Sequence, residues 1–224
     1  MDFLLKDVFH EAINQPEGWE TGMARYYAHY AQDFVYANTD LLMNFLDNHD
    51  IDRFSTAVKG DVRKYKMGLA MLMTTRGYPQ IYYGTEIMID GIPGSYEGHR
   101  FDFPGGWKED ARNAFSRSGR TDVENEVFDY LKTLLHYRKN NTVLQNGRMK
   151  QFIPQDGIYV YFRYNDSKTV MVMANNNEDE KNVEMSRFAE MLDNKTKATE
   201  ITSGKTVDLT SVKIPAKTVW VMEL

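Results

Sequence analysis

A group of polar side chains that could bind a ligand directly follows a short apolar run. The run is LLMNFL, at residues 41–46, and the side chains after it are Asn48, His49, Asp50, Asp52 and Arg53. All five types can hydrogen-bond a polar ligand, and His49 with Asp50 could also supply two ligands to a metal ion. For these residues taken alone, a purely structural role is favoured, with Asn48 and Asp50 capping the next element and His49 bonding a neighbour.

The surrounding pattern indicates how such residues would be positioned. Because residues 41–46 are apolar without alternation, they predict a short, fully buried strand. Residues 61–76 predict a helix, with Asp61 near its start and Gly77 just past its end, and QIYYG at 80–84 predicts a second buried strand. In parallel α/β folds the functional side chains lie at the carboxyl ends of strands, so DNHDIDR would face a ligand there.

Three further segments have helical patterns. The N-terminal segment predicts a helix that begins at once, with Asp2 as its cap, and residues 20–36 fit another. The strongest pattern lies at 121–140, where Thr121 and Glu124 have the spacing of a capping box. Strands that alternate with helices of this length are typical of βα units and a parallel sheet.

The pattern changes after about residue 145. Three short β-rich runs follow, IYVYFRY (158–164), TVMVMAN (169–175) and TVWVMEL (218–224), separated by turn-forming residues. They predict a small antiparallel β-sandwich with one solvent-facing side on each sheet. We therefore expect two domains, an α/β domain at 1–143 and an all-β domain at 144–224.

Composition excludes several classes of protein and partner. The net charge of −5, without a basic cluster, argues against nucleic acid, and the absence of cysteine excludes disulfides and thiolate metal sites. No apolar run approaches the ~18 residues that a membrane span needs. The acidic N-terminus is unlike a secretory signal, so we expect a soluble chain whose compartment, cytoplasmic or periplasmic, stays open.

Two motifs in order resemble the alpha-amylase family of glycoside hydrolases. The residues similar to the family's fourth conserved region, on barrel strand seven, are Phe45, Asn48, His49 and Asp50. Those similar to the strand-eight segment are Gly77, Pro79, Tyr82, Tyr83, Gly84 and Glu86. RFDFPGGW, at 100–107 within a Gly- and Pro-rich loop, resembles the next loop of the neopullulanase and cyclomaltodextrinase branch. The resemblance covers nearly the whole chain and implies a partial (β/α)8 TIM barrel, strands 7 and 8 with flanking helices, followed by the antiparallel β-sandwich.

The resemblance also implies site roles. Asp50 would be the third catalytic acid, which bonds sugar hydroxyls at the scissile subsite, and His49 and Asn48 would contact the same sugar. The further substrate-binding candidates are Arg53, Tyr83, Glu86 and Arg100. Arg53 and Glu86 could instead fix loops or form an ion pair inside the strand-to-helix turns.

The loop after the second strand offers two more candidates. Asp102 and Trp107 could line a distal subsite with Arg100, or could serve structure alone. Because Tyr82 and Tyr83 would alternate across a strand, at most one of them would face a ligand.

The reactive pair of a retaining glycosidase has no match in this chain. Such enzymes use two carboxylates about 5 Å apart, and the family places them in an Arg-x-Asp pattern and a later Glu. Neither pattern occurs before residue 41. The family's calcium-bearing regions are also unmatched, so no cofactor is expected.

The expected function follows from these matches and gaps. We expect the C-terminal portion of a retaining alpha-glucan hydrolase, neopullulanase-like, that cleaves alpha-glycosidic bonds in starch-derived glucans. Its ligand would be an alpha-glucan or maltooligosaccharide, and the chain alone would be inactive. Two strands taken from a closed barrel expose edges and an apolar face, which predicts self-association or packing of the helices over that face in a non-barrel arrangement.

Two other functions remain open. A non-catalytic carbohydrate-binding or interaction module would present exposed aromatic residues on one sheet face, and Trp220 and Tyr159 are the candidates. A metal-dependent hydrolase built on His49 and Asp50 would need more ligands, and the other histidines have no ligand spacing.

Overall fold

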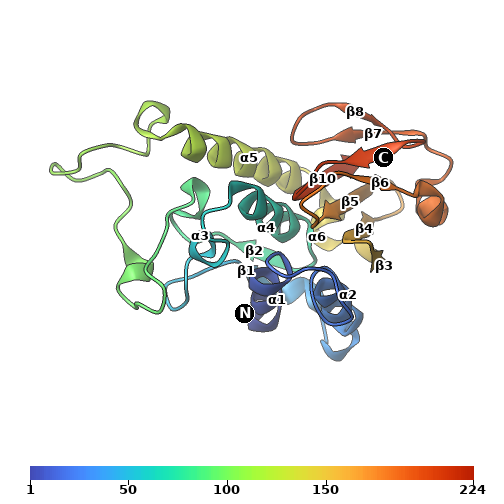
Figure 1. Ribbon diagram of the computed structural model, residues 1–224, viewed down its shortest axis with the longest axis horizontal. Helices are drawn as coiled ribbons and strands as arrows, with labels where there is room; N and C mark the ends of the chain where they lie inside the picture. The colour runs from blue at the N-terminus through green and yellow to red at the C-terminus, as the bar shows by residue number, and fades with distance from the viewer.

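The computed structural model describes residues 1–224 and places a helical N-terminal part beside a β-rich C-terminal part (Figure 1). The α-helices are α1 (Phe3–Ala12), α2 (Ala24–Ala31), α3 (Phe54–Ala57), α4 (Val62–Thr74), α5 (Asp122–Lys139), α6 (Thr142–Asn146) and α7 (Ala189–Leu192). The strands are β1 (Met43–Phe45), β2 (Tyr78–Gln80), β3 (Arg148–Gln155), β4 (Ile158–Tyr164), β5 (Thr169–Asn175), β6 (Lys181–Val183), β7 (Lys197–Glu200), β8 (Thr206–Asp208), β9 (Val212–Ile214) and β10 (Thr218–Glu223). Single 3₁₀ turns are η1 (Asp33–Val35), η2 (Thr39–Leu41), η3 (Thr85–Ile87), η4 (Gly98–Arg100), η5 (Arg117–Gly119) and η6 (Met185–Phe188).

Three helices begin where their caps predict. The carboxylate of Asp2 accepts from the backbone N–H of Leu5 at 3.0 Å and starts α1. Asp61 caps α4 in the same way. Thr121 and Glu124 form both bonds of the capping box at the start of α5. The structure confirms these predictions. Each cap accepts from backbone N–H groups of the first turn, which have no acceptor within the helix.

Two predicted elements are shorter or displaced. The helix predicted at 20–36 is α2 followed by η1. The strand predicted at 80–84 is wrong in position, because β2 covers Tyr78–Gln80 and pairs in parallel with β1. The chain leaves the sheet after Gln80, and the carbonyl of Tyr83 accepts from Arg53 at 2.7 Å instead of from a neighbouring strand.

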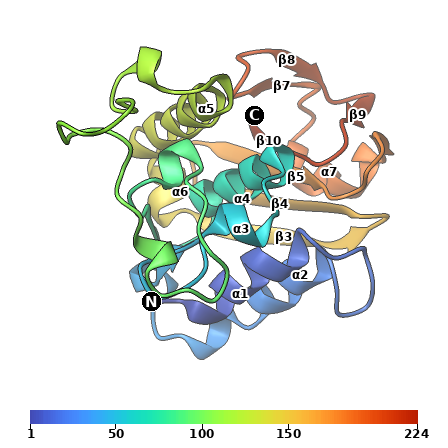
Figure 2. The ribbon, with the colours of Figure 1, turned by 60° about the vertical axis from the view of Figure 1, so that its left-hand side comes forward.

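The β-rich part is an antiparallel sheet of six strands in the order β3-β4-β5-β10-β7-β8, with β6 and β9 forming a separate pair. The prediction of one solvent-facing side is wrong for the central strands, since β4 and β5 are buried almost throughout. One face carries Tyr159, Tyr161 and Val172 into the core shared with α1, α4 and α5. The other face packs Val160 and Phe162 against α7, η6 and β9. Figure 2 shows α4 beside the sheet and α2 beneath β3.

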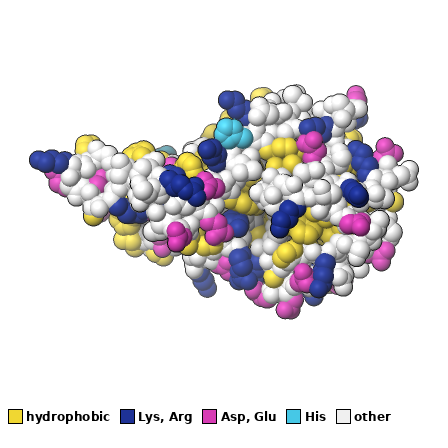
Figure 3. Space-filling view, turned by 90° about the horizontal axis from the view of Figure 1, so that it is seen from above, with side chains coloured by type: hydrophobic (Ala, Val, Ile, Leu, Met, Phe, Trp, Pro, Cys, Tyr) yellow, Lys and Arg dark blue, Asp and Glu magenta, His cyan; other side chains and the backbone are white.

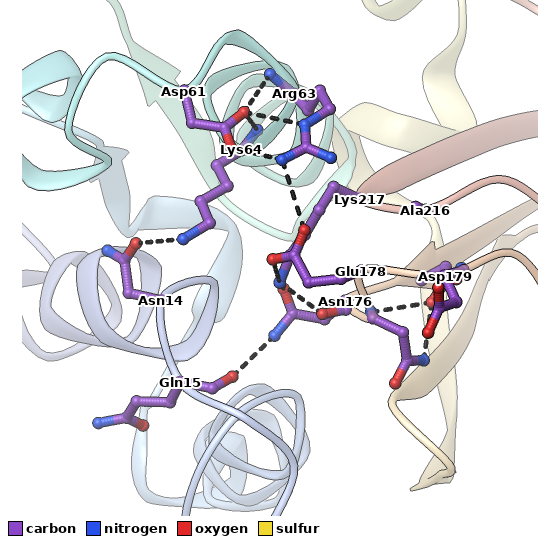
Figure 4. Close-up of polar contacts among 12 residues, drawn as sticks. Asn14, Gln15, Asp61, Arg63, Lys64, Asn176, Glu178, Asp179, Ala216 and Lys217 are labelled. Atoms are coloured by element: carbon purple, nitrogen blue, oxygen red, sulfur yellow. Dashed lines mark hydrogen bonds and ion pairs between the residues drawn. The ribbon is translucent and has the colours of Figure 1, made fainter.

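Polar contacts also join the sheet to the helical part (Figure 4). Lys217, in the turn before β10, is buried and donates from Nζ to the amide oxygen of Asn176 at 3.0 Å. Asn176 in turn donates to the carbonyls of Ala12, the last residue of α1, and of Gln15, just after that helix, at 3.1 and 3.0 Å. Because the two parts share a core and these bonds, the division between residues 143 and 144, which falls inside α6, stays a prediction.

None of the helices combines the length and the apolar character that crossing a bilayer requires.

Candidate functional site

The turn after β1 presents Asp50 and His49 to solvent. Their side chains are 52% and 58% exposed, and Nε2 of His49 lies 3.2 Å from Oδ2 of Asp50. Asn48 is buried, and its side-chain oxygen accepts from the backbone N–H of Asp50 at 2.8 Å. This bond shapes the turn, so Asn48 supports the two residues that face outward.

Arg100 reaches the same turn from η4. Its Nε donates to the carbonyl of His49 at 2.9 Å, and its Nη2 donates to Oδ1 of Asp50 at 3.1 Å. The face of Tyr96 lies 3.6 Å from the guanidinium carbon and supports it from the other side. The structure therefore brings Arg100 to His49 and Asp50, although Arg100 lies fifty positions after Asp50 in the sequence.

Arg53 lies beneath this group and is fully buried. Its Nε donates to the carbonyl of His99 at 3.0 Å and its Nη1 donates to the carbonyl of Tyr83 at 2.7 Å. The guanidinium also lies 4.1 Å from the ring centre of Tyr82. These contacts correspond to the loop-fixing alternative for Arg53. They join two places to the end of β1, namely η4 and the segment that follows β2.

The remaining two sequence candidates differ from each other. Tyr83 is 40% exposed, and its hydroxyl donates to the carbonyl of Phe101 at 3.0 Å. Glu86 lies in η3, and its Oε2 is buried without a hydrogen-bond partner. The expectation that Tyr82 and Tyr83 alternate across a strand is wrong, because both follow β2 and their rings lie 4.5 Å apart.

Asp52 and Tyr82 were named from sequence without a site role, and His99 was missed. Nε2 of His99 lies 2.8 Å from Oδ1 of Asp52, which also accepts from the backbone N–H of Gly94 at 2.9 Å. The Gly94 N–H and His99 hold the pKa of Asp52 below its usual value. Tyr82 was matched as a motif residue but not as a site residue, and its ring lies 6.4 Å from that of His49. His99 carries no local signal, because only the fold brings it to this turn.

A cavity of about 430 Å³ adjoins Asp50. Its lining includes Lys6, His10, Asp50, Asp52, Tyr96 and His99. A larger cavity of about 610 Å³ lies between α4 and the β7–β8 hairpin and shares no residue with this set.

The arrangement suits hydrogen bonding to hydroxyl groups. A solvent-facing carboxylate, an imidazole and a guanidinium within reach of one another offer acceptors and donors to a polyol. No three His, Asp or Glu side chains converge closely enough to hold a metal ion, so the metal-hydrolase alternative lacks a ligand set. Tyr159 is fully buried, so it cannot be an exposed binding aromatic as the module alternative needs.

Comparison with known proteins gives matches along most of the chain. Residues 1–114 match the alpha amylase catalytic domain, and residues 149–223 match the cyclo-malto-dextrinase C-terminal domain. A cyclomaltodextrin glucanotransferase of Klebsiella oxytoca is 29% identical over 164 residues, which cover 64% of this chain and 24% of that protein. A cyclomaltodextrinase of a Bacillus species is 27% identical over 144 residues, 62% of this chain and 23% of that protein.

Solved structures show the same fold. An alpha-amylase from Geobacillus thermoleovorans, crystallised with acarbose, aligns with 98% of this chain and 46% of its own at a TM-score of 0.74 and 24% identity. A cyclic alpha-maltosyl-(1→6)-maltose hydrolase from Arthrobacter globiformis aligns with 100% of this chain and 44% of its own at a TM-score of 0.69 and 16% identity. The chain thus spans less than a quarter of these curated relatives and less than half of these solved chains.

Proposed function

Because the chain belongs to the alpha-amylase family, we propose that it is the C-terminal portion of a retaining alpha-glucan hydrolase of the neopullulanase and cyclomaltodextrinase type. Its ligand would be an alpha-glucan or a maltooligosaccharide. The observation that carries this proposal is the exposed contact between Asp50, His49 and Arg100 at the end of β1.

In this proposal Asp50 is the acid that binds sugar hydroxyls beside the scissile bond. The transition state of glycoside cleavage resembles an oxocarbenium ion, so a nearby carboxylate stabilises it, and hydroxyl bonds that tighten there lower the barrier further. His49 would bond hydroxyls of the same sugar. Arg53, Asn48 and Arg100 would hold the turn in shape.

We further propose that β1 and β2 correspond to strands seven and eight of the family's barrel. Their parallel pairing and the site at the end of β1 support this assignment. Asp52 is engaged by His99 and Gly94, and no second carboxylate bonds to the Asp50 group. Because the Arg-x-Asp pattern and its later Glu have no match before residue 41, we expect no hydrolytic turnover from these 224 residues alone.

A binding experiment with a matched control tests this function. Titration of maltohexaose into the purified chain by calorimetry or NMR should show saturable binding, and Asp50→Asn should weaken it about tenfold, since a bond to a charged acceptor is lost. The control is Asp166→Asn, whose carboxylate is 99% exposed in a turn of the β-rich part. Equal affinity for Asp50→Asn and the wild type, or release of reducing sugar well above the blank, would refute the proposal.

Self-association belongs to the same proposal. Apolar side chains near β1 remain in solvent, with Leu4 64%, Leu41 71% and Tyr78 49% exposed. Phe3 is 46% exposed and lies edge-on to Phe45 at 5.1 Å, so it covers only part of that face. We expect concentration-dependent oligomers in analytical ultracentrifugation.

A charged substitution on this face tests where the oligomers form. Leu41→Glu should suppress them, while Val123→Glu on α5, where the native side chain is 44% exposed, should not. A strict monomer at high concentration, or equal effects of the two substitutions, would contradict the prediction.

A further inference from the structure

Residues 101–120, here called the arm, project away from the body of the molecule. Figure 1 shows the arm as an extended loop between η4 and α5, and Figure 3 shows the same narrow extension in space-filling form. Near its middle Trp107 is 68% exposed. Most of this indole is therefore open to solvent, where its face is accessible to a ligand.

Two ion pairs and one cation–π contact hold the base of the arm against α5. Arg112 bonds both carboxylate oxygens of Glu124 at 2.6 and 2.7 Å, and Arg117 bonds Asp129 at 2.7 Å. Arg120 lies 3.9 Å from the ring centre of Phe128. The arm is therefore fixed in one place relative to α5, and a bidentate pair such as that of Arg112 also fixes orientation.

The fold of the arm itself sets the position of Trp107. The rings of Phe103 and Phe115 lie 4.5 Å apart and close the two sides of the arm on each other. Gly105 and Gly106 have φ of +120° and +106°, which other residues rarely adopt, and they turn the chain just before Trp107. Its backbone N–H then donates to Oδ2 of Asp110 at 2.9 Å.

Polar side chains surround this tryptophan, and two of them keep polar atoms free of hydrogen bonds. A cavity of about 560 Å³ is lined by Trp107 together with Lys108, Asp110, Arg112 and Asn113. Asp110 keeps Oδ1 free, and Asn113 uses only its oxygen, in a bond from the N–H of Phe115 at 3.0 Å. An aromatic face beside carboxylate, amide and ammonium groups is the chemistry that binds a sugar ring, with its C–H face on the indole and its hydroxyls on the polar groups.

The arm is connected to the candidate site at its base. Arg100, immediately before the arm, bonds Asp50, and Trp107 follows seven residues later, which limits the distance between the two Cα atoms to about 25 Å. A sugar chain of several units could therefore contact both places at once.

We propose that Trp107, Asp110 and Asn113 form a distal sugar-binding platform, which holds the far part of an alpha-glucan chain whose other end lies at Asp50. This inference rests on the proposed function for its choice of an alpha-glucan. The platform makes affinity depend on ligand length, because short oligosaccharides reach only one of the two places.

Trp107 is largely exposed and Trp19 is fully exposed, so the two tryptophans allow a matched test. Trp107→Ala should weaken maltoheptaose binding about fivefold to tenfold and leave maltotriose binding unchanged, while Trp107→Phe should retain most of the affinity. The control is Trp19→Ala, since Trp19 is completely exposed between α1 and α2 and should not affect either ligand. Cellohexaose should compete poorly with maltoheptaose. Circular dichroism should show the same melting temperature for all three variants.

The outcomes separate this inference from the proposed function. If Trp107→Ala binds maltoheptaose as tightly as the wild type, the platform is refuted, and a loss with Asp50→Asn would still support the site at β1. If Trp107→Ala weakens binding and Asp50→Asn does not, the platform stands and the proposed site fails. Absence of saturable maltoheptaose binding by the wild type, or an equal loss with Trp19→Ala, overturns the platform.

Discussion

Nη2 of Arg100 lies 3.1 Å from Oδ1 of Asp50, so the residue that precedes the arm holds the carboxylate at the end of β1. The same side chain bonds the carbonyl of His49, which fixes both exposed residues of the turn through one guanidinium. Rigid placement matters for a residue that binds a ligand in one orientation, because a bond made only after reordering costs free energy. The contact between Arg100 and Asp50 therefore has consequences for affinity.

Replacement of Arg100 should weaken ligand binding without affecting the fold. Arg100→Gln removes the fork that orients Asp50, and we expect about a threefold loss of maltohexaose affinity in calorimetry. The melting temperature should not change, because the ion pair is exposed and screened by solvent. Arg148→Gln is the matched control, since Arg148 pairs with Asp166 at 2.7 Å on the surface of the β-rich part. Unchanged affinity in Arg100→Gln would show that Asp50 needs no such support.

Replacement of Arg53 should instead destabilise the protein. Arg53→Met leaves the buried carbonyls of Tyr83 and His99 without a donor, and we expect the free energy of unfolding in urea to fall by about 3 kcal/mol. Arg63→Met on α4, where the native side chain is 53% exposed, should cost less than about 0.5 kcal/mol. Similar losses for the two variants would contradict a loop-fixing role for Arg53.

The sequence was most informative where the cause of structure is local. Asp61 and the pair Thr121 and Glu124 predicted helix starts correctly, because a capping bond spans two or three residues and its spacing is visible in the sequence. The sequence also placed Asp50 and His49 just after a short strand, but the expected full burial of residues 41–46 is wrong, because Leu41 is 71% exposed before β1. Local signals of this kind do not depend on the rest of the fold.

Features that depend on distant segments were not predicted. β2 ends at Gln80, opposite the last residue of β1, and beyond it Arg53 bonds the carbonyl of Tyr83 across thirty positions of sequence. Both faces of β4 are buried because Tyr159 and Tyr161 pack into the helical core while Val160 and Phe162 pack against α7, η6 and β9, which no alternation along the strand could reveal. His99 lies in a loop without periodicity, so its contact with Asp52 left no signal.

Asp2 should make stability depend on acid pH. Burial alone would raise the pKa of its carboxyl, but hydrogen bonds from His29, the N–H of Leu5 and Arg76 lower it from the ordinary 3.8 to about 2. A carboxyl whose pKa is lowered by folding stabilises the folded state when the pH lies above the pKa of the unfolded chain. Asp2 therefore contributes about 2 kcal/mol above pH 4. This contribution is lost as pH falls from about 4 to about 2.

Asp2→Asn isolates that contribution, because an amide retains the capping oxygen and removes the charge. The variant should be about 2 kcal/mol less stable than the wild type at pH 6, and the difference should shrink toward zero near pH 2. Urea unfolding of both proteins across this range provides the measurement. A difference that stays constant with pH would contradict the linkage between Asp2 ionisation and folding.

Gly77 should be essential to the pairing of β1 with β2. Its φ is +77°, and an added Cβ would overlap the carbonyl oxygen of Leu42 and lie 2.8 Å from Nδ2 of Asn44. That carbonyl accepts from the N–H of Tyr78 at 2.9 Å, and this bond joins the residue before β1 to the first residue of β2. Gly77→Ala therefore adds a steric overlap to the ordinary cost of a positive φ, and we expect a loss of about 3 kcal/mol.

Gly60→Ala separates the two contributions, because Gly60 also has a positive φ, of +71°, with no atom within 4 Å of an added Cβ. It should cost only about 1 kcal/mol, which is the conformational part alone. Since β1 leads directly into the turn that carries Asp50, Gly77→Ala should also weaken maltohexaose binding, whereas Gly60→Ala should leave the affinity unchanged. Urea unfolding and calorimetry measure the two effects, and equal losses of stability for the two variants would mean that the overlap at Leu42 is relieved at no cost.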